Sequence, residues 1–241
     1  MKISVIIPAF NEERLIGETL RRVKAATAAF AQREWVTEII VCDNNSTDRT
    51  TELSRAEGAA VVFEPVNQIA RARNAGAAAA TGDWLVFIDA DTHPSVELFA
   101  EVVEQMATGR CLAGGCTMKF TGHYPVANLS ARLWNGLSRA ARLLAGSFIF
   151  CEAGAFREVG GFNNALFAGE EIDLSQRLKR LARAKQKRIV ILHRHPLLTS
   201  ARKVHLYTLR EYLRFLVRFA LSPKRILRSR EECHTWYDGR R

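Results

Sequence analysis

The chain lacks long hydrophobic runs. None of its 241 residues falls in an uncharged apolar stretch approaching the roughly 18 residues needed to span a bilayer. The nearest stretch, residues 143–156, is interrupted by Gly146, Glu152 and Gly154. The start of the chain also lacks the charged-then-apolar layout of a signal peptide. We therefore expect neither an integral membrane protein nor a secretory leader.

Paired cysteines are also lacking. The 5 cysteines form no C-x-x-C pair, their number is odd, and most lie in apolar, strand-like segments. This pattern argues against a disulfide framework and a metal–thiolate centre. It favours buried, reduced thiols in a cytosolic protein. The cysteines are Cys42, Cys111, Cys116, Cys151 and Cys233.

Acidic residues are scarce in one part of the chain. The net charge is +10, but residues 177–241 hold 19 Lys and Arg against 4 Asp and Glu, whereas residues 1–176 hold 16 against 21. The basic part contains no recognised nucleic-acid module and no platform of aromatic side chains, so we expect no nucleic-acid partner.

Strand-like and helical segments alternate through the first part of the chain. Such alternation predicts an α/β fold with a mostly parallel central sheet and right-handed crossovers, flanked by helices. The length suits one large domain, which we place at 1–204, with a basic tail at 205–241. The expected strands are 3–7, 37–42, 59–63 and 84–88, and the expected helices are 12–30, the segment up to residue 56, and 70–80.

Beyond residue 91 the pattern is less regular. We expect a Gly-Gly turn at 160–161 and a helix that begins in the acidic cluster 170–173 and runs to about residue 184. The further expected helices are 95–106 and 126–144, and the further expected strands are 111–120, 147–151 and a final one at 189–192.

Two acids follow the most apolar strand. Asp89 and Asp91, separated by Ala90, come directly after Trp84–Ile88. Carboxylates at the carboxyl edge of a parallel sheet lie where such sheets bind ligands. Mg²⁺ or Mn²⁺ prefers oxygen ligands and bridges to substrate phosphates, so the pair suggests a nucleotide diphosphate site. The alternative is a polar turn that closes the strand.

Three other loops should meet the same edge: 8–12, 43–48 and 71–76. Asp43 or Glu12 could accept hydrogen bonds from a base or ribose, and Arg73 could offset phosphate charge. For Asp43 a helix cap is an equally good interpretation.

A second acidic cluster contains Glu170, Glu171 and Asp173. These carboxylates could simply stabilise the first turn of a helix through its dipole. The functional alternative is a general base that takes a proton from an attacking hydroxyl group.

Taken together, these segments resemble family 2 glycosyltransferases of the GT-A fold, the Rossmann-like fold of enzymes that use nucleotide-diphosphate sugars. The resemblance rests on five segments in the family's order, and it covers residues 3 to about 180. The segments are 5–13, 41–48, 72–76, 87–91, and Gly160-Gly161-Phe162 followed by 169–174.

The resemblance implies an inverting, metal-dependent enzyme that transfers sugar from a nucleotide sugar. It implies that Asp89 and Asp91 hold Mn²⁺ or Mg²⁺ and that the 170–173 cluster supplies the base. The donor site then comprises Pro8, Ala9, Phe10, Glu12, Asp43, Arg73, Asp89, Ala90, Asp91 and Arg202.

Two details of this assignment depend on position alone. The family usually has Glu-Asp where this chain has Glu170-Glu171, so Glu171 inherits the role of base with one extra methylene, and Glu170 or Asp173 could share it. GT-A enzymes often add a histidine metal ligand from the region after the last strand, which points to His195 or His193. For these histidines a solvated loop is the alternative, and for Arg202 a solvated position is the alternative to clamping the diphosphate.

The segment 205–221 has leucine and valine on one helical face and arginine on another. It could pack on the domain or lie on an anionic membrane surface. We therefore expect a cytoplasmic protein, with peripheral contact at the inner membrane face as one of the two alternatives.

The function expected is transfer of a sugar to a hydroxyl or to a lipid-linked phosphate acceptor. A phosphate acceptor would need no strong base. The rival is a non-catalytic protein of the same fold that binds a nucleotide sugar or an anionic lipid. Nucleotidyl transfer is disfavoured, because the segment 8–14 has no glycine- and lysine-rich phosphate loop.

Overall fold

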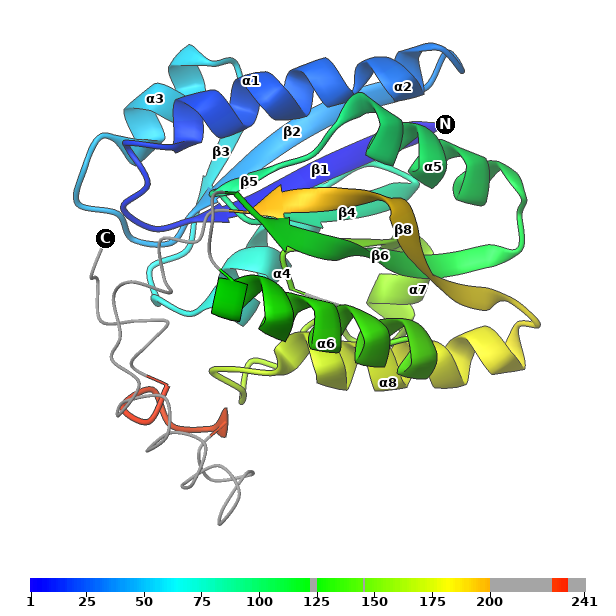
Figure 1. Ribbon diagram of the computed structural model, residues 1–241. Coiled ribbons are helices and arrows are strands. Elements are labelled where there is room, and N and C mark those ends of the chain that lie inside the picture. Colours follow the sequence, from blue (N-terminus) through cyan, green and yellow to red (C-terminus); the bar gives the residue numbers. More distant parts are fainter. Residues whose placement is uncertain (122–124, 145, 200–226, 234–241) are drawn as a thin grey trace.

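The computed structural model describes residues 1–121, 125–144, 146–199 and 227–233. Within these residues, one twisted sheet has eight strands in the order β3-β2-β1-β4-β7-β6-β8-β5 (Figure 1). Neighbouring strands are parallel except where β7 or β5 pairs with its neighbours. The strands are β1 Lys2–Ala9, β2 Val36–Asp43, β3 Ala60–Phe63, β4 Trp84–Ile88, β5 Thr92–His93, β6 Cys111–Phe120, β7 Phe148–Glu152 and β8 Arg188–Thr199.

Helices cover both faces of the sheet (Figure 1). One layer holds α1, α2, α3 and α5, and the other holds α4, α6, α7 and α8. The helices are α1 Ile16–Ala26, α2 Ala28–Ala31, α3 Thr50–Ala56, α4 Ile69–Ala79, α5 Val96–Ala107, α6 Pro125–Ala141, α7 Ala153–Glu158 and α8 Glu170–Ala184.

Alternating side chains of the central strands build a separate core on each face. On the α1 side, Val5 and Val86 pack with Phe99 of α5. On the other side, Ile6 and Phe87 pack with Leu174 and Leu178 of α8. A strand buried on both faces needs an unbroken apolar run, and this explains why β4 is the most apolar segment of the chain.

The predicted α/β class, the parallel first half and the buried free cysteines are confirmed. The predicted end of the last strand is wrong. It was expected to end at residue 192, but β8 continues to Thr199 because it pairs with the long strand β6 on one side and with β5 on the other. His193 and His195 therefore lie within a strand and not in a loop, and β5 was not anticipated.

The predicted tail, 205–241, lies outside the described residues except for 227–233. That short segment contacts the body of the protein beside α8. The Phe167 amide donates to the Leu227 carbonyl at 2.6 Å, and buried Cys233 packs with Ala168. The boundary expected at residue 204 stays a prediction.

Candidate active site

The carboxyl ends of β1, β2 and β4 meet at one edge of the sheet. Ala9 pairs with Asp43 at the ends of β1 and β2, and Ile6 pairs with Phe87, so Asp89 lies at nearly the same level. The Asn44 amide donates to the Ala9 carbonyl at 2.8 Å, which extends the contact into the loops. The structure thus brings together the loops that the sequence placed at this edge.

The loops after β1 and β2 fasten each other. Asn11 adopts a left-handed backbone conformation, with φ of 52°, and its side-chain oxygen accepts from the Thr47 amide at 2.8 Å. The Glu12 amide donates to the Thr50 hydroxyl at 2.7 Å. Glu12 and Asp43 are both buried here, beside the buried Pro8 and Ala9. This part of the site is therefore held together by contacts within the protein itself.

Asp43 closes a turn and does not cap the following helix. Its carboxylate accepts from the Ser46 amide at 3.1 Å. The N-cap residue of α3 is Arg49, and the Thr50 amide at the start of that helix donates to Asp48 at 3.0 Å.

Arg73 of α4 connects three distant parts of the chain. Its guanidinium donates through Nη1 to Glu170 at 2.7 Å, and through Nη2 to Asp89 at 2.9 Å and to the Gly146 carbonyl at 2.8 Å. The side chain is only 1% exposed, and it lies 5.3 Å from the centre of the Phe162 ring. One buried cation therefore joins the acid after β4 to the first acid of α8.

This geometry changes the role expected for Arg73. The sequence suggested a free donor for substrate phosphates, but within the described residues both terminal nitrogens already have partners, and buried Nε has none. Arg73 therefore positions carboxylates. The signals for its partners were indirect: Gly146 interrupts an apolar run, and Phe162 follows the Gly-Gly turn.

The three acids at the start of α8 have different environments. Gly169, with φ of 72°, turns the chain into the helix. Glu170 is 3% exposed and is held by Arg73. Asp173 pairs with Arg177 one turn further on, at 2.6 Å. Glu171 makes no salt bridge within the described residues, so it is the member of the cluster whose carboxyl is not tied to a cation.

Burial, and then the neighbouring charge of Glu170, raises the pKa of Glu171 to about 8. Arg73 opposes this shift but does not cancel it. A carboxyl group with a pKa in this range is a stronger base than an ordinary glutamate, and it exchanges a proton near neutral pH.

Asp89 and Asp91 are suited to a divalent cation. Arg73 occupies one oxygen of Asp89, whose side chain remains 26% exposed, and Asp91 is also partly exposed. Within the described ranges no three His, Cys, Asp or Glu side chains gather closely enough to hold a metal. Two carboxylates suit Mg²⁺ or Mn²⁺, which keep water and phosphate oxygens as their other ligands.

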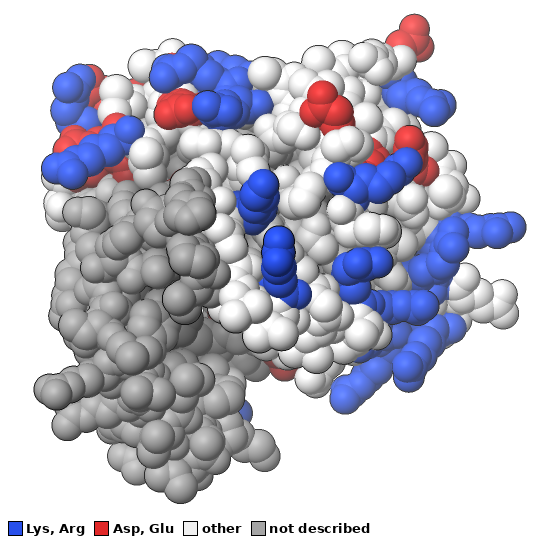
Figure 2. Space-filling view, in the orientation of Figure 1, with Lys and Arg blue, Asp and Glu red and all other residues white. Residues whose placement is uncertain are grey.

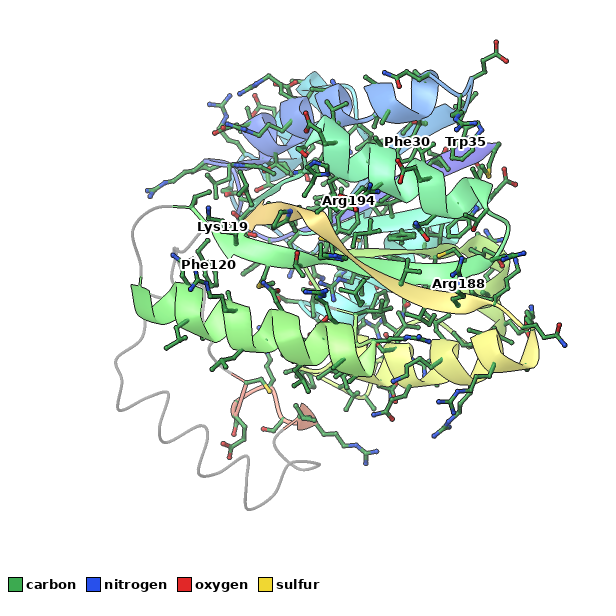
Figure 3. All side chains as sticks on the ribbon, turned by 45° about the vertical axis from the view of Figure 1, so that its right-hand side comes forward. Phe30, Trp35, Lys119, Phe120, Arg188 and Arg194 are labelled. Carbon is green, nitrogen blue, oxygen red and sulfur yellow. The ribbon has the colours of Figure 1, made fainter. Side chains whose placement is uncertain are left out.

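His195 does not join these acids. Its Nδ1 lies 2.6 Å from Glu101 of α5, and the neighbouring Arg194 contacts the same glutamate. Figure 3 shows Arg194 on the α5 side of β8. Thr199, not His195, is the β8 residue opposite Thr92, and four residues of strand span roughly 13 Å. We therefore omit His195 from the proposed metal site.

His93 was not considered from the sequence, although it follows Asp91 by two residues. Its Nε2 is buried and has no hydrogen-bond partner in the described part of the chain. Burial and then the charge of Arg22 lower its pKa, so the ring is neutral at physiological pH. Arg202 lies outside the described residues.

The solved structures that this chain resembles include glycosyltransferases of the GT-A fold. The mannosyltransferase PcManGT from Pyrobaculum calidifontis, solved with GDP-Man and Mn²⁺, has a TM-score of 0.67 at 20% identity, over 94% of this chain and 62% of that one. Glucosyl-3-phosphoglycerate synthase from Mycobacterium tuberculosis, solved with Mn²⁺ and UDP, has a TM-score of 0.64 at 24% identity, over 92% and 79%. At these identities the likeness establishes the fold.

The sequence establishes the family. Residues 4–158 match the model of glycosyl transferase family 2, and the chain belongs to this family. An undecaprenyl-phosphate 4-deoxy-4-formamido-L-arabinose transferase from Pseudomonas paraeruginosa is 35% identical over 124 residues, 46% of this chain and 34% of the relative. Glycosyltransferase AglE from Haloferax volcanii is 28% identical over 190 residues, 73% of this chain and 60% of the relative. The chain thus spans about a third to three fifths of these relatives' lengths.

Proposed function

We propose that this protein is an inverting glycosyltransferase that moves a sugar from a nucleotide-diphosphate donor to an acceptor hydroxyl. The observation that carries the proposal is the buried Arg73, which holds Asp89 and Glu170 at one point although they lie 81 residues apart in the sequence. An acid that would hold the metal beside the donor diphosphate and a carboxyl cluster that includes a candidate base must meet near one reacting carbon, and the Arg73 link brings the two elements together.

The donor would lie across the carboxyl edge of the sheet. Glu12 and Asp43, with Pro8, Ala9 and Phe10 beside them, would contact the nucleoside. Asp89 and Asp91 would hold Mn²⁺ or Mg²⁺, which when bound neutralises charge on the departing diphosphate. The metal-bearing GT-A structures described above support this placement.

Glu171 would act as the general base. It takes the proton from the acceptor hydroxyl while that oxygen attacks the anomeric carbon on the face opposite to the diphosphate, which inverts the configuration. Burial, and then the neighbouring Glu170, raise the pKa of Glu171 to about 8, which makes it an effective base.

A lipid-linked phosphate is the second candidate acceptor, because several relatives carry the name of undecaprenyl-phosphate transferases. An acceptor phosphate is already ionised and does not need Glu171 as a base. The two acceptors therefore differ in what the loss of that carboxyl would do.

The test is transfer from a panel of nucleotide sugars with Mn²⁺, using Glu171→Gln and, as a matched control, Asp173→Asn. For a hydroxyl acceptor we expect Glu171→Gln to lower kcat by about 10²-fold or more, since a lost general base has this effect, and to leave donor affinity unchanged. The control should retain most activity, because Asp173 is paired with Arg177.

Other outcomes are equally informative. Normal turnover of Glu171→Gln with a polyprenyl phosphate would assign the lipid-linked acceptor. Binding of donor without any transfer or hydrolysis would contradict an enzymatic function and favour a binding protein with the same fold.

A further inference from the structure

Helix α6 presents an apolar stripe to solvent. Leu129, Leu133 and Leu137 recur every fourth residue, so they share one helical face, and they are 58%, 69% and 53% exposed. Ala140 continues the stripe by one more turn, while the opposite face contains the buried Ala131 and Ser138. Contiguous apolar side chains are rarely left exposed in water unless something covers them.

The stripe ends at a strongly basic pocket. A cavity of about 400 Å³ begins at Ala140 and lies between the ends of α6 and α8 and the start of β8. Its lining includes five basic residues: Arg142, Lys179, Arg183, Lys187 and Arg188. Figure 3 shows Arg188 at the end of β8 that lies near α8.

Several of these cations have no counter-charge. Lys187 pairs with Glu152, and Lys179 donates to the Ala141 carbonyl at 2.6 Å. Within the described residues, Arg142, Arg183 and Arg188 make no ion pair, and all three are exposed. Uncompensated charges that are held together repel one another, so an anion on this surface would relieve the repulsion.

The apolar and basic areas belong to one face of the molecule. Figure 2 shows a largely uncharged area in the region of α6, with Lys and Arg gathered at its lower right-hand edge. Arg132 and Arg139 flank the leucines along the helix. Leucine beside arginine is the composition of helices that lie in the interface of an anionic bilayer.

We propose that this face, formed by the outer side of α6 and the basic pocket at its end, binds the surface of an anionic lipid bilayer. The leucines enter the boundary between headgroups and acyl chains, and the unpaired arginines contact lipid phosphates. A second copy of the chain is a poorer occupant, because a two-fold contact uses the same patch on both copies, and the lining of this pocket offers the arginines no acidic partner. The basic pocket is separate from the sheet edge that carries the proposed donor site, because it lies where β8 begins.

The first test is co-sedimentation of the full chain with vesicles of phosphatidylcholine and phosphatidylglycerol in equal parts. Leu133→Ser/Leu137→Ser is compared with Val36→Ser/Phe63→Ser, which removes two similarly exposed apolar side chains elsewhere. We expect the leucine variant to bind vesicles at least about ten-fold more weakly, because each methylene buried in the bilayer raises the affinity about four-fold. The control variant should bind as the wild type does. All four side chains are exposed, so circular dichroism should show an unchanged Tm.

The second test removes charge. Arg183→Gln/Arg188→Gln is compared with Arg33→Gln/Arg55→Gln, two exposed arginines that also make no ion pair among the described residues. We expect binding about thirty-fold weaker for the first variant, because each basic residue near an anionic surface contributes about five-fold. The control should change binding much less.

Wild-type affinity in both test variants would overturn the proposal. So would equal binding to vesicles of phosphatidylcholine alone, or displacement from vesicles by low concentrations of inorganic phosphate, which would indicate a site for a soluble anion. A wild-type dimer that becomes a monomer on Leu133→Ser/Leu137→Ser would assign the stripe to contact between copies. None of these results depends on sugar transfer, so they leave the proposed function untouched.

Discussion

At the scale of single residues, Arg73 determines how the site is built. A buried guanidinium is stable only if its charge is compensated, and Asp89 and Glu170 provide the compensation from two separate elements. Lysine could not replace it, because a single ammonium group lacks the planar fork that reaches three acceptors at once. The same contacts hold the Glu170 carboxylate in place, whereas burial and then the neighbouring Glu170 raise the pKa of Glu171.

We predict that Arg73→Ala lowers the free energy of unfolding by about 3–5 kcal/mol, the cost of leaving buried charge unpaired. Arg73→Lys should lower it by about 1–3 kcal/mol, since the charge remains but hydrogen bonds are lost. The control is Arg71→Lys on the same helix, where a partly exposed pair with Glu64 contributes about 1 kcal/mol or less. Urea denaturation measures all three, and equal losses at the two positions would contradict the account.

The raised pKa of Glu171 predicts how the rate of the reaction depends on pH. Its pKa is raised to about 8 by burial and by Glu170, so the fraction present as a base grows as the pH rises through that value. For a hydroxyl acceptor, kcat/KM should therefore increase from pH 6 to about pH 8 and then level off. Asp173→Asn should leave this rise of kcat/KM with pH unchanged. A rise centred near the ordinary pKa of glutamate would show that Glu171 is not the base.

The same shift acts on stability in the opposite direction. The folded state keeps a proton on Glu171 that the unfolded chain gives up at the ordinary glutamate pKa. The resulting stabilisation is complete below that ordinary value and is lost as the pH rises through about 8. Stability and catalytic competence at this carboxyl therefore oppose each other.

At the scale of elements, two glycines differ in how much room surrounds them, and substitution should therefore affect stability differently at each. A Cβ at Gly114 of β6 would lie 2.4 Å from the Phe150 ring on β7, whereas one at Gly136 of α6 would meet nothing within 4 Å. The first glycine is required by the approach of two strands. The second lies in a helix, where glycine costs stability.

Accordingly, Gly114→Ala should destabilise the protein by about 1–3 kcal/mol through overpacking. Gly136→Ala should stabilise it by about 0.5–1 kcal/mol, because alanine loses less backbone entropy in a helix. Thermal unfolding followed by circular dichroism distinguishes the two directions. Destabilisation by Gly136→Ala would show that the outer face of α6 is packed more tightly than described.

The elements also show what the sequence could predict. Apolar runs and helical periodicity were sufficient for β1 to β4 and for α8, because these elements are buried in the regular way that such patterns describe. The continuation of β8 through His193 to Thr199 was not predictable, since polar residues become a strand only when β6 and β5 supply partners from distant parts of the chain. For the same reason β5, two residues long, left no pattern of its own.

At the scale of the whole molecule, the chain separates its charges. The acids of the candidate donor site lie at the carboxyl edge of the sheet, whereas Lys and Arg gather around the end of α6 (Figure 2). The sequence revealed the uneven distribution of charge and the acids of the candidate site. It could not show that the Arg73 guanidinium is hydrogen-bonded within the protein or that His195 contacts Glu101. Those facts depend on how the elements pack. Within the described residues, no helix combines the length and apolarity needed to cross a bilayer.

The central claim is that Asp89 and Asp91 mark a metal-dependent donor site, and calorimetric titration of nucleotide sugars tests it most directly. The titration is made with and without Mn²⁺ on the wild type, on Asp91→Asn and on a control, Asp83→Asn. The control also replaces an aspartate by asparagine, but at the residue that directly precedes β4. We predict that Mn²⁺ makes at least one nucleotide sugar bind far more tightly to the wild type and to Asp83→Asn. In Asp91→Asn this Mn²⁺-dependent increase in affinity should be lost, because an amide is a poorer metal ligand than a carboxylate. Unchanged, Mn²⁺-dependent affinity in Asp91→Asn would contradict the account.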